Sequence, residues 1–272
     1  MKNHLEKVEN YLSDGLLFAK ILEDSAKFAL RRAFGRINSS KINIILVDLD
    51  GTLINSNSPL DALALKFGAT KANKIFNDIL TDFKAGKSDF DQTVYFTNLA
   101  VSNAKLKKSD WENLLDFYLH NGKISVHLLA ALKIAKSKKV KVIIATRSSL
   151  VFAKTVSDRL GFDGAIGTYI SEKNHPYIIG SKNATSPKFK IYTKLGKLSS
   201  MFKQHKNFDF SKIAVISNDA MDSQELASSG LGILLTHKNK PSPVEKLART
   251  FELYDLLLKE GVGLEKKLLK AI

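Results

Sequence analysis

A short apolar run that ends in two aspartates is the sequence feature that most constrains the fold. Residues 42–47 read Ile-Asn-Ile-Ile-Leu-Val, and residues 48–53 follow as Asp-Leu-Asp-Gly-Thr-Leu. A nearly continuous apolar run of this length is typical of a strand buried on both faces of a parallel sheet. Side chains alternate along an extended chain, so Asp48 and Asp50 are expected to face the same side. The sequence therefore predicts a core strand whose carboxyl end presents two carboxylates to one ligand.

The chain downstream of this strand first reads as helical and then alternates between strands and helices. Apolar runs predict further buried strands at 140–145, 213–216 and 232–235, helices at 150–160 and 193–203, and a hairpin that pairs 166–170 with 177–179. Such alternation predicts an α/β fold with a doubly wound, Rossmann-like parallel sheet. In sheets of this type the ligand lies beyond the carboxyl ends of the strands.

Helical spacing of apolar residues divides the rest of the chain. The expected units are an N-terminal helical extension (1–40), a core (41–58 and 137–240), a helical unit inserted between its halves (59–136) and a C-terminal helical segment (241–272). The apolar stripe of the last unit includes Tyr254 and Leu258. Both terminal segments are expected to pack on the core or on each other, and a homodimer contact or a membrane-surface helix is the alternative.

The composition limits the cellular compartment and the binding partners that we expect. The formal charge is +15 and the chain has no cysteine, which removes disulfides, thiolate metal sites and a cysteine nucleophile. No apolar run approaches the ~20 residues of a membrane span. The lysines are scattered and lack the aromatic interleaving of nucleic-acid modules. We therefore expect a cytoplasmic protein with no membrane span, no nucleic-acid partner and a small anionic metabolite as ligand.

Paired aspartates at the end of a strand can have two other roles. A calcium loop needs an acidic or amide residue at 52, glycine at 53 and glutamate at 59, whereas the chain has Thr52, Leu53 and Pro59. Solvated aspartates in a simple turn are the second alternative, and the buried strand before them disfavours that reading.

The segment from Asp48 to Thr52 resembles the first motif of the haloacid dehalogenase superfamily, a hydrophobic strand followed by Asp-x-Asp-Gly-Thr. This resemblance implies that Asp48 is a phosphoryl-accepting nucleophile and Asp50 a general acid/base. Dehalogenases of the superfamily lack the second aspartate, so the resemblance points to phosphate chemistry. The implied intermediate is an aspartyl-phosphate, and the implied cofactor is Mg²⁺.

Two further motifs of the superfamily supply phosphate contacts. The run at 142–146, Val-Ile-Ile-Ala-Thr, is similar to the second motif and makes Thr146 a phosphate ligand, with Arg147 as a candidate beside it or as a surface arginine. The third motif is a lysine at the start of the helix before the last acidic strand. Lys194 matches it, and Lys188 and Lys190 are close rivals.

The fourth motif binds the metal and is usually Gly-Asp-x-x-x-Asp. Residues 217–222 read Ser-Asn-Asp-Ala-Met-Asp, which puts Asn218 where an aspartate is usual and Asp222 at the second acidic position. An amide oxygen ligates Mg²⁺ without bringing charge. The implied metal ligands are then Asp48, Asp50, Asn218, Asp219 and Asp222. Capping of the next helix by Asp222, with Glu225 completing a capping box, is the alternative role.

The resemblance extends to one branch of the superfamily. Residues 85–93, Ala-Gly-Lys-Ser-Asp-Phe-Asp-Gln-Thr, and residues 152–179 are similar to the phosphoserine phosphatase branch, in which a helical cap selects substrates. That branch carries a glutamate and an arginine on its cap, and the nearest residues here are Asn57 and Tyr95. This departure disfavours phosphoserine, and Tyr95 or Phe96 suggests a less polar or aromatic leaving group.

The sequence thus predicts a Mg²⁺-dependent phosphatase that hydrolyses a small phosphate monoester. Two alternatives remain at this point. One is a phosphotransferase or phosphomutase of the same fold, which passes the phosphoryl group to an organic acceptor. The other is a catalytically impaired binding module, in which Asn218 weakens metal binding.

Overall fold

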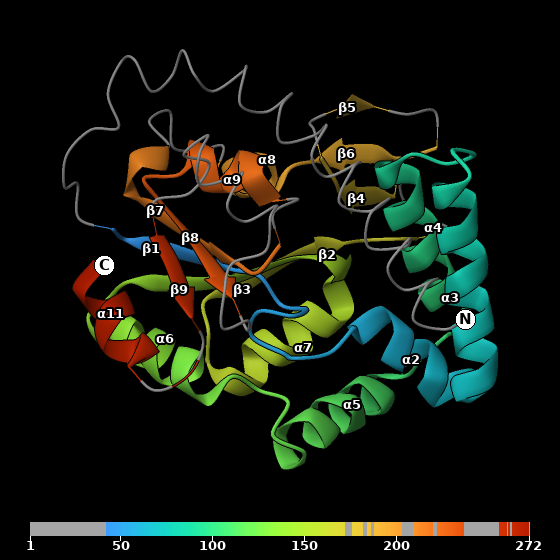
Figure 1. Ribbon diagram of the computed structural model, residues 1–272, viewed down its shortest axis with the longest axis horizontal. Helices are drawn as coiled ribbons and strands as arrows, with labels where there is room; N and C mark the ends of the chain where they lie inside the picture. Colours follow the sequence, from blue (N-terminus) through green and yellow to red (C-terminus); the bar gives the residue numbers. More distant parts are fainter. Residues whose placement is uncertain are drawn as a thin grey trace, which may run out of the picture.

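A parallel sheet of six strands forms the centre of the protein (Figure 1). The computed structural model describes residues 42–171, 176–181, 184–185, 188–202, 209–219, 222–236, 256–259, 261 and 263–271. The strand order is β3-β2-β1-β7-β8-β9, and every neighbouring pair is parallel. The α/β fold with a Rossmann-like parallel sheet is confirmed.

The strands of this sheet are β1 (Ile44–Val47), β2 (Lys141–Ser149), β3 (Gly164–Thr168), β7 (Ile213–Ser217), β8 (Leu231–Thr236) and β9 (Leu256–Lys259). A second, three-stranded sheet has the order β4-β6-β5 and contains β4 (Tyr177–Ile179), β5 (Ala184–Thr185) and β6 (Lys190–Tyr192). The α-helices are α2 (Ser58–Phe67), α3 (Ala69–Lys84), α4 (Phe90–Asn103), α5 (Lys108–His120), α6 (Val126–Ser137), α7 (Leu150–Leu160), α8 (Lys194–Met201), α9 (Ser223–Ser228) and α11 (Leu264–Ala271), and a short 3₁₀ helix spans Phe210–Lys212.

Alternating side chains of the central strands enter two separate cores. Ile45 and Val47 of β1 belong to the cluster shared with α5, α6 and α7, whereas Leu46 points to the cluster shared with α8 and α9. All three side chains are at most 1% exposed. The sheet is therefore covered on both faces, which explains why the sequence of β1 is apolar without alternation.

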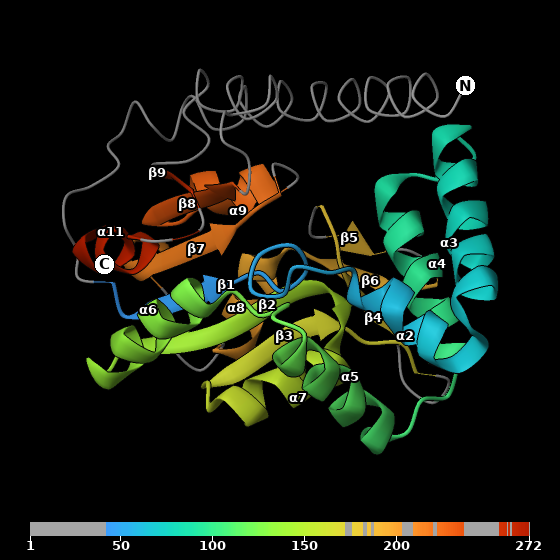
Figure 2. The same ribbon diagram turned by 60° about the horizontal axis from the view of Figure 1, so that its bottom comes forward.

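The helices between β1 and β2 divide into two groups. Helices α2, α3 and α4 pack on one another and stand at one end of the molecule (Figures 1 and 2). Helix α5 packs on both α7 and α2, and α6 packs on β2 and α11. Leu63 of α2 and Val101 of α4 belong to the same buried cluster as Leu115 of α5 and Leu132 of α6. The bounds of the helical unit expected over 59–136 stay a prediction.

Local sequence signals set several helix boundaries. The side chain of Asn57 accepts a hydrogen bond from Leu60 N at the start of α2, and proline follows in the first turn. Asp89 and Gln92 form a capping box at the start of α4. Gly161 ends α7 in the left-handed conformation, with φ 73°.

The predicted hairpin is wrong in most of its length. Strand β3 pairs along β2 in the main sheet, and β4 pairs in parallel with β6. One antiparallel bridge, between Tyr169 and Tyr177, is the only backbone pairing between the two predicted arms among the described residues, and Ile179 N also donates to Thr168 Oγ1. Strands β3 and β4 stand at the edges of two different sheets, which local sequence patterns do not reveal.

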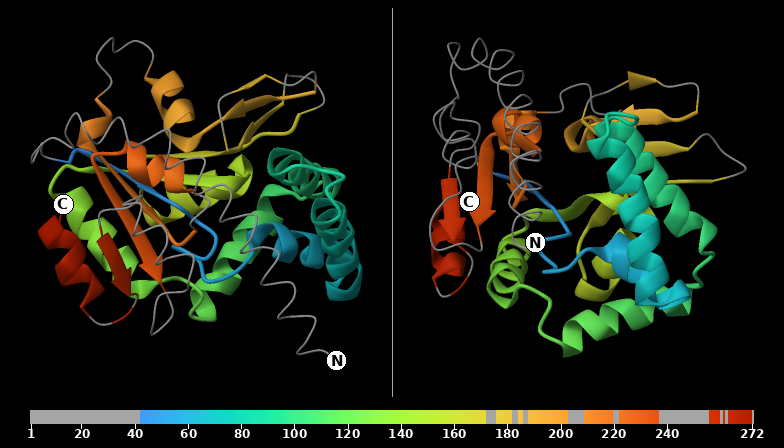
Figure 3. Two further views of the ribbon diagram at one scale, coloured as in Figure 1. Left: turned by 45° about the horizontal axis from the view of Figure 1, so that its top comes forward. Right: turned by 45° about the vertical axis from the view of Figure 1, so that its right-hand side comes forward.

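The C-terminal segment is also corrected in part. Residues 256–259 form β9 at the edge of the main sheet, where a helix was expected, and α11 follows and packs on α6 (Figure 3). Leu258 is buried as a strand residue. The N-terminal extension expected over 1–40 lies outside the described residues. No helix in the described ranges is both long and apolar enough to cross a membrane.

Candidate active site

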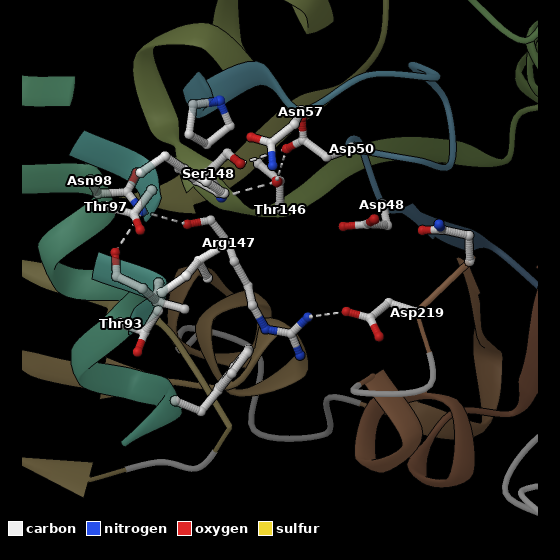
Figure 4. Close-up of a pocket in the computed structure, with 16 residues that line it drawn as sticks. Asp48, Asp50, Asn57, Thr93, Thr97, Asn98, Thr146, Arg147, Ser148 and Asp219 are labelled. Atoms are coloured by element: carbon white, nitrogen blue, oxygen red, sulfur yellow. Dashed lines mark hydrogen bonds and ion pairs between the residues drawn. The ribbon is translucent and has the colours of Figure 1, made fainter. Parts of the chain in front are cut away.

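A cavity of about 360 Å³ opens at the carboxyl ends of the central strands (Figure 4). Asp48 and Asp50 line it from the segment after β1, Thr146, Arg147 and Ser148 from the end of β2, and Asn218 and Asp219 from the segment after β7. Residues distant in sequence meet here because β1 lies between β2 and β7. The two carboxylates predicted to share a ligand therefore line one cavity.

Lys194 contacts Asp48 from the first turn of α8. Its Nζ lies 2.7 Å from Asp48 Oδ1 and 2.5 Å from Asp222 Oδ2, and the lysine is 1% exposed. The rival residues Lys188 and Lys190 are exposed on the chain before α8. Burial works against the charged form of Lys194, but the carboxylates of Asp222 and Asp48 outweigh it and raise the lysine pKa. The lysine therefore stays protonated beside the nucleophile candidate.

The pKa of Asp48 is raised to about 6, mainly by burial. The ion pair with Lys194 works in the opposite direction, and the charge of Asp222 adds to the rise. A positive charge next to Asp48, such as a bound cation, favours the ionised carboxylate that a nucleophile needs.

Asp50 is held by three donors at the edge of the cavity. Ser58 N donates to its Oδ1 at 2.6 Å, and the hydroxyls of Ser148 and Thr146 lie 2.5 and 3.4 Å from its Oδ2. Burial raises the pKa of Asp50, and the hydrogen bonds from Ser148 and Ser58 lower it again in part. A carboxyl group with these opposing influences is suited to both giving and taking a proton.

Arg147 does not sit at the surface. Its guanidinium lies 2.5 Å from Asp222 Oδ1 and 3.7 Å from Asp219 Oδ2, and its carbon Cζ stands 5.2 Å from the ring centre of Phe90. The neighbouring carboxylates, above all Asp222, raise the arginine pKa against the effect of burial. Figure 4 shows the side chain extending across the cavity toward Asp219. Arg147 thus lines the cavity, and its role as a phosphate contact stays a prediction.

Asp222 lies behind the cavity and does not line it. Burial works to raise its pKa, but Arg147 and Lys194 outweigh burial and lower it to about 2. Ser217 Oγ also donates to Asp222 Oδ2, at 2.6 Å. Asp222 stands at the start of α9 without a side-chain capping bond, so the capping alternative is not observed. Its two cationic partners make it an anchor for Lys194 and Arg147.

The turn between Asp50 and Thr52 brings Asn218 against the first motif. Gly51 has φ 74°, and a Cβ added there would lie 2.4 Å from Asn218 Nδ2. Thr52 Oγ1 lies 2.8 Å from Asn218 Oδ1 and 3.1 Å from Asp48 Oδ2, and it accepts a hydrogen bond from Asn218 N. Only glycine allows this close approach, which places the amide oxygen of Asn218 near Asp48.

The oxygen atoms around Asp48 are suitable ligands for a hard cation that keeps most of its bound water. Carboxylate and amide oxygens from Asp48, Asn218 and Asp219 share the cavity, and Mg²⁺ is usually held by one or two carboxylates and several waters. The described residues contain no group of three or more His, Cys, Asp or Glu side chains that could hold a metal ion. The oxygens present therefore suit Mg²⁺ bound together with a phosphate, rather than a closed protein cage.

Sequence reasoning missed four residues of the site. Ser148 contacts Asp50, Ser217 contacts Asp222, and Glu225 Oε1 accepts from Lys194 N at 3.2 Å. Burial and the charge of Asp222 raise the pKa of Glu225 to about 7. Asn98 of α4 donates to the carbonyls of Val94 and Arg147. These residue types are common at the ends of strands and on helices. The sequence alone therefore carries no signal that distinguishes them.

Tyr95 and Phe96 do not line the cavity. Tyr95 stacks on Phe189 with ring centres 4.5 Å apart, and Phe96 is 41% exposed. Asn57, expected near the position of a cap glutamate, does line the cavity. The apolar lining comes instead from Pro59, Phe76, Leu80, Phe90 and Val94.

Comparisons with known proteins agree with this arrangement. Solved structures with the same fold include a protein of unknown function from Bordetella pertussis (TM-score 0.57, 14% identity, 80% of this chain and 99% of that one). A phosphoserine phosphohydrolase-like protein from Francisella tularensis has a TM-score of 0.55 and 15% identity over 85% of this chain and 100% of that one. A haloacid dehalogenase family hydrolase from Salmonella enterica serovar Typhi has a TM-score of 0.50 and 20% identity, and the match covers 76% of this chain and 65% of that one.

The family assignment rests on the sequence match. No curated protein matches the chain. The family model described as haloacid dehalogenase-like hydrolase matches residues 42–195, which is more than half of the chain. The match includes the strand ends that carry Asp48, Asp50 and Thr146, and Lys194 at the start of α8. This chain belongs to the haloacid dehalogenase-like hydrolase family.

Proposed function

We propose that this protein is a Mg²⁺-dependent phosphatase that hydrolyses a small phosphate monoester. The observation that carries the proposal is the meeting of Asp48, Asp50 and Thr146 at one cavity, with the buried Lys194 in contact with Asp48, from segments that are far apart in sequence. The fold shared with the phosphoserine phosphohydrolase-like protein supports the same reaction class.

In the proposed reaction Asp48 attacks the phosphorus atom and the leaving alkoxide departs. Phosphate dianions repel a carboxylate, so charge neutralisation must precede attack. Lys194 supplies one fixed positive charge 2.7 Å from the nucleophile. When bound, Mg²⁺ supplies the remaining neutralisation and orients the phosphate. The Asp48 carboxylate, the backbone carbonyl of Asp50 and the side chains of Asn218 and Asp219 would hold it.

Asp50 is the proposed proton carrier. In the first step its protonated form donates to the leaving oxygen, and in the second it accepts a proton from the water that hydrolyses the aspartyl-phosphate. The hydroxyls of Thr146 and Ser148 hold its Oδ2 at the cavity edge. Thr146 and Arg147 are the proposed phosphate contacts, together with Lys194. Cytoplasmic location and homodimer formation stay predictions from the sequence.

The test is hydrolysis of p-nitrophenyl phosphate by the full chain, with Mg²⁺ and after chelation. We expect turnover that depends on the metal and falls on the order of 10³-fold or more in Asp48→Asn. Asp158→Asn, a change to an exposed carboxylate on α7, is the matched control and should keep full activity. Wild-type activity in Asp48→Asn would refute the proposed nucleophile. Absence of turnover with any phosphoester would favour the binding-module alternative.

A further inference from the structure

The charged and uncharged residues of the cavity lie on different sides. Its charged members are Asp48, Asp50, Arg147 and Asp219. The three aspartates follow strands of the main sheet, and Arg147 lies near the end of β2. The opposite wall, in the described part of the chain, comes from α2, α3, α4 and the residue that caps α2, and none of these lining residues is charged. This wall consists of Asn57, Pro59, Phe76, Leu80, Phe90, Thr93, Val94, Thr97 and Asn98.

The charges on the sheet side already have partners within the site. Arg147 is engaged by Asp222 and Asp219, and Lys194 by Asp48 and Asp222. A phosphate and its metal would occupy the remaining space next to Asp48. A second charge that the alcohol part carried into the cavity would lie against the uncharged wall. Burying such a charge without a partner is strongly unfavourable.

One neutral polar atom of this wall is unused. Asn98 is 5% exposed, its Nδ2 donates to Val94 O and Arg147 O, and its Oδ1 is buried without a hydrogen-bond partner in the described structure. A single amide oxygen matches one hydroxyl or amide donor. It does not balance an ammonium group, which carries a full charge and three donors.

We infer that the alcohol part of the substrate carries no charge and is largely apolar: an aryl or alkyl phosphate without an ammonium or carboxylate group. This inference deepens the proposed function and rests on it. Phosphorylated amino acids are the class that the wall disfavours. The volume of about 360 Å³ lies within the range of small-molecule pockets.

The test compares two esters of similar length and the same phenolic phosphate. One is 4-propylphenyl phosphate, and the other is O-phosphotyrosine, which adds an ammonium and a carboxylate. Titration calorimetry on Asp48→Asn with Mg²⁺ measures binding without turnover. We expect the neutral ester to bind at least about ten-fold more tightly, because its tail leaves no charge unpaired. Equal or tighter binding of O-phosphotyrosine, or no binding of either ester, would overturn the inference.

A charge added to the wall gives a second readout. Leu80 is half-buried on α3, so Leu80→Arg introduces a cation that the carboxylate of O-phosphotyrosine can reach. We expect Leu80→Arg to reduce the preference for the neutral ester several-fold, and the uncharged control Leu80→Met to retain it. An unchanged preference in Leu80→Arg contradicts the assigned wall. Turnover by the wild type is measured separately. If the protein binds the neutral ester selectively but hydrolyses neither ester, the phosphatase proposal fails and the inference about the wall stands.

Discussion

Ser148 connects the chemistry of Asp50 to the end of β2. Its hydroxyl lies 2.5 Å from Asp50 Oδ2, and its backbone N donates to Thr146 Oγ1 at 3.0 Å. The hydrogen bond to Asp50 favours the ionised carboxylate and so opposes the rise in pKa that burial causes. Ser148 therefore acts through Asp50 as a positioning residue.

We expect Ser148→Ala to raise the pKa of Asp50 further and to lower kcat about ten-fold. This is less than the roughly 10²–10⁴-fold contribution of a general acid/base itself, because Ser148 acts through Asp50. The limb of the pH–kcat profile that belongs to Asp50 should move to higher pH, because the ionised form loses a donor. Ser149→Ala is the control, since that hydroxyl accepts from Val151 N at the start of α7 and does not contact Asp50. A profile that keeps its limb in Ser148→Ala would contradict this role.

At the residue scale the sequence predicted the motif carboxylates better than their partners. Asp48 and Asp50 follow from a strand that must end where polar residues begin. Lys194 was one of three lysines with similar spacing, and only the tertiary contact with Asp48 distinguishes it. Ser148 lies where the register between β2 and β3 shifts, between Ala145 and Ser149. No sequence pattern predicts that shift, so the contact of Ser148 with Asp50 could not be predicted.

At the element scale, Asp163 joins β2 to the turn between α7 and β3. Its Oδ2 accepts from Val142 N at 2.8 Å, its own N donates to Val142 O at 2.8 Å, and Lys136 Nζ of α6 lies 2.5 Å from Oδ1. Burial works to raise the pKa of Asp163, but the donors from Lys136 and Val142 outweigh it and lower the pKa.

A carboxyl group with a lowered pKa stabilises the fold when it is ionised, so its contribution is present above the ordinary value and is lost as pH falls. We expect Asp163→Asn to reduce the free energy of unfolding by roughly 1 kcal/mol at pH 7. The difference from wild type should shrink below pH about 4, where the unfolded aspartate is protonated. Urea denaturation at several pH values measures it, with Asp158→Asn as control. A difference that does not change with pH would contradict the assignment.

Among the elements, long periodic segments and buried strands were predicted best. The helix over 150–160 and the strand at 213–216 are both found where the sequence predicts them. Strand β9 was missed because it has four residues inside a stretch whose leucines also fit helical spacing. The parallel pairing of β4 with β6 was missed because it joins two segments that are not consecutive strands, and no local pattern predicts such a pairing.

At the scale of the whole molecule, the C-terminal segment completes the main core. Strand β9 extends the sheet beyond β8, and α11 packs on α6 through Leu264 and Leu268, which are 1% and 0% exposed. The last residues of the chain therefore stabilise a helix that is encoded before residue 140.

We expect Leu268→Ala to lower the free energy of unfolding by about 2–5 kcal/mol, because it leaves a cavity between α11 and α6. Lys267→Ala, a change to an exposed neighbour on the same helix, should alter it by less than about 0.5 kcal/mol. Chemical denaturation of both variants checks the comparison. Equal stability of the two variants would show that α11 is peripheral.

The position of β1 between β2 and β7 has a consequence for biosynthesis. The chain leaves the ribosome from its N-terminus, and the partners of β1 begin at Lys141 and Ile213. The nascent strand therefore waits for the synthesis of β2 before its first ladder forms and for the synthesis of β7 before its second. Pairings between such distant segments form slowly, and an unpaired apolar strand is prone to aggregate in the interval. The same central placement that brings the carboxylates to the cavity makes this protein a candidate for assistance by chaperones during synthesis.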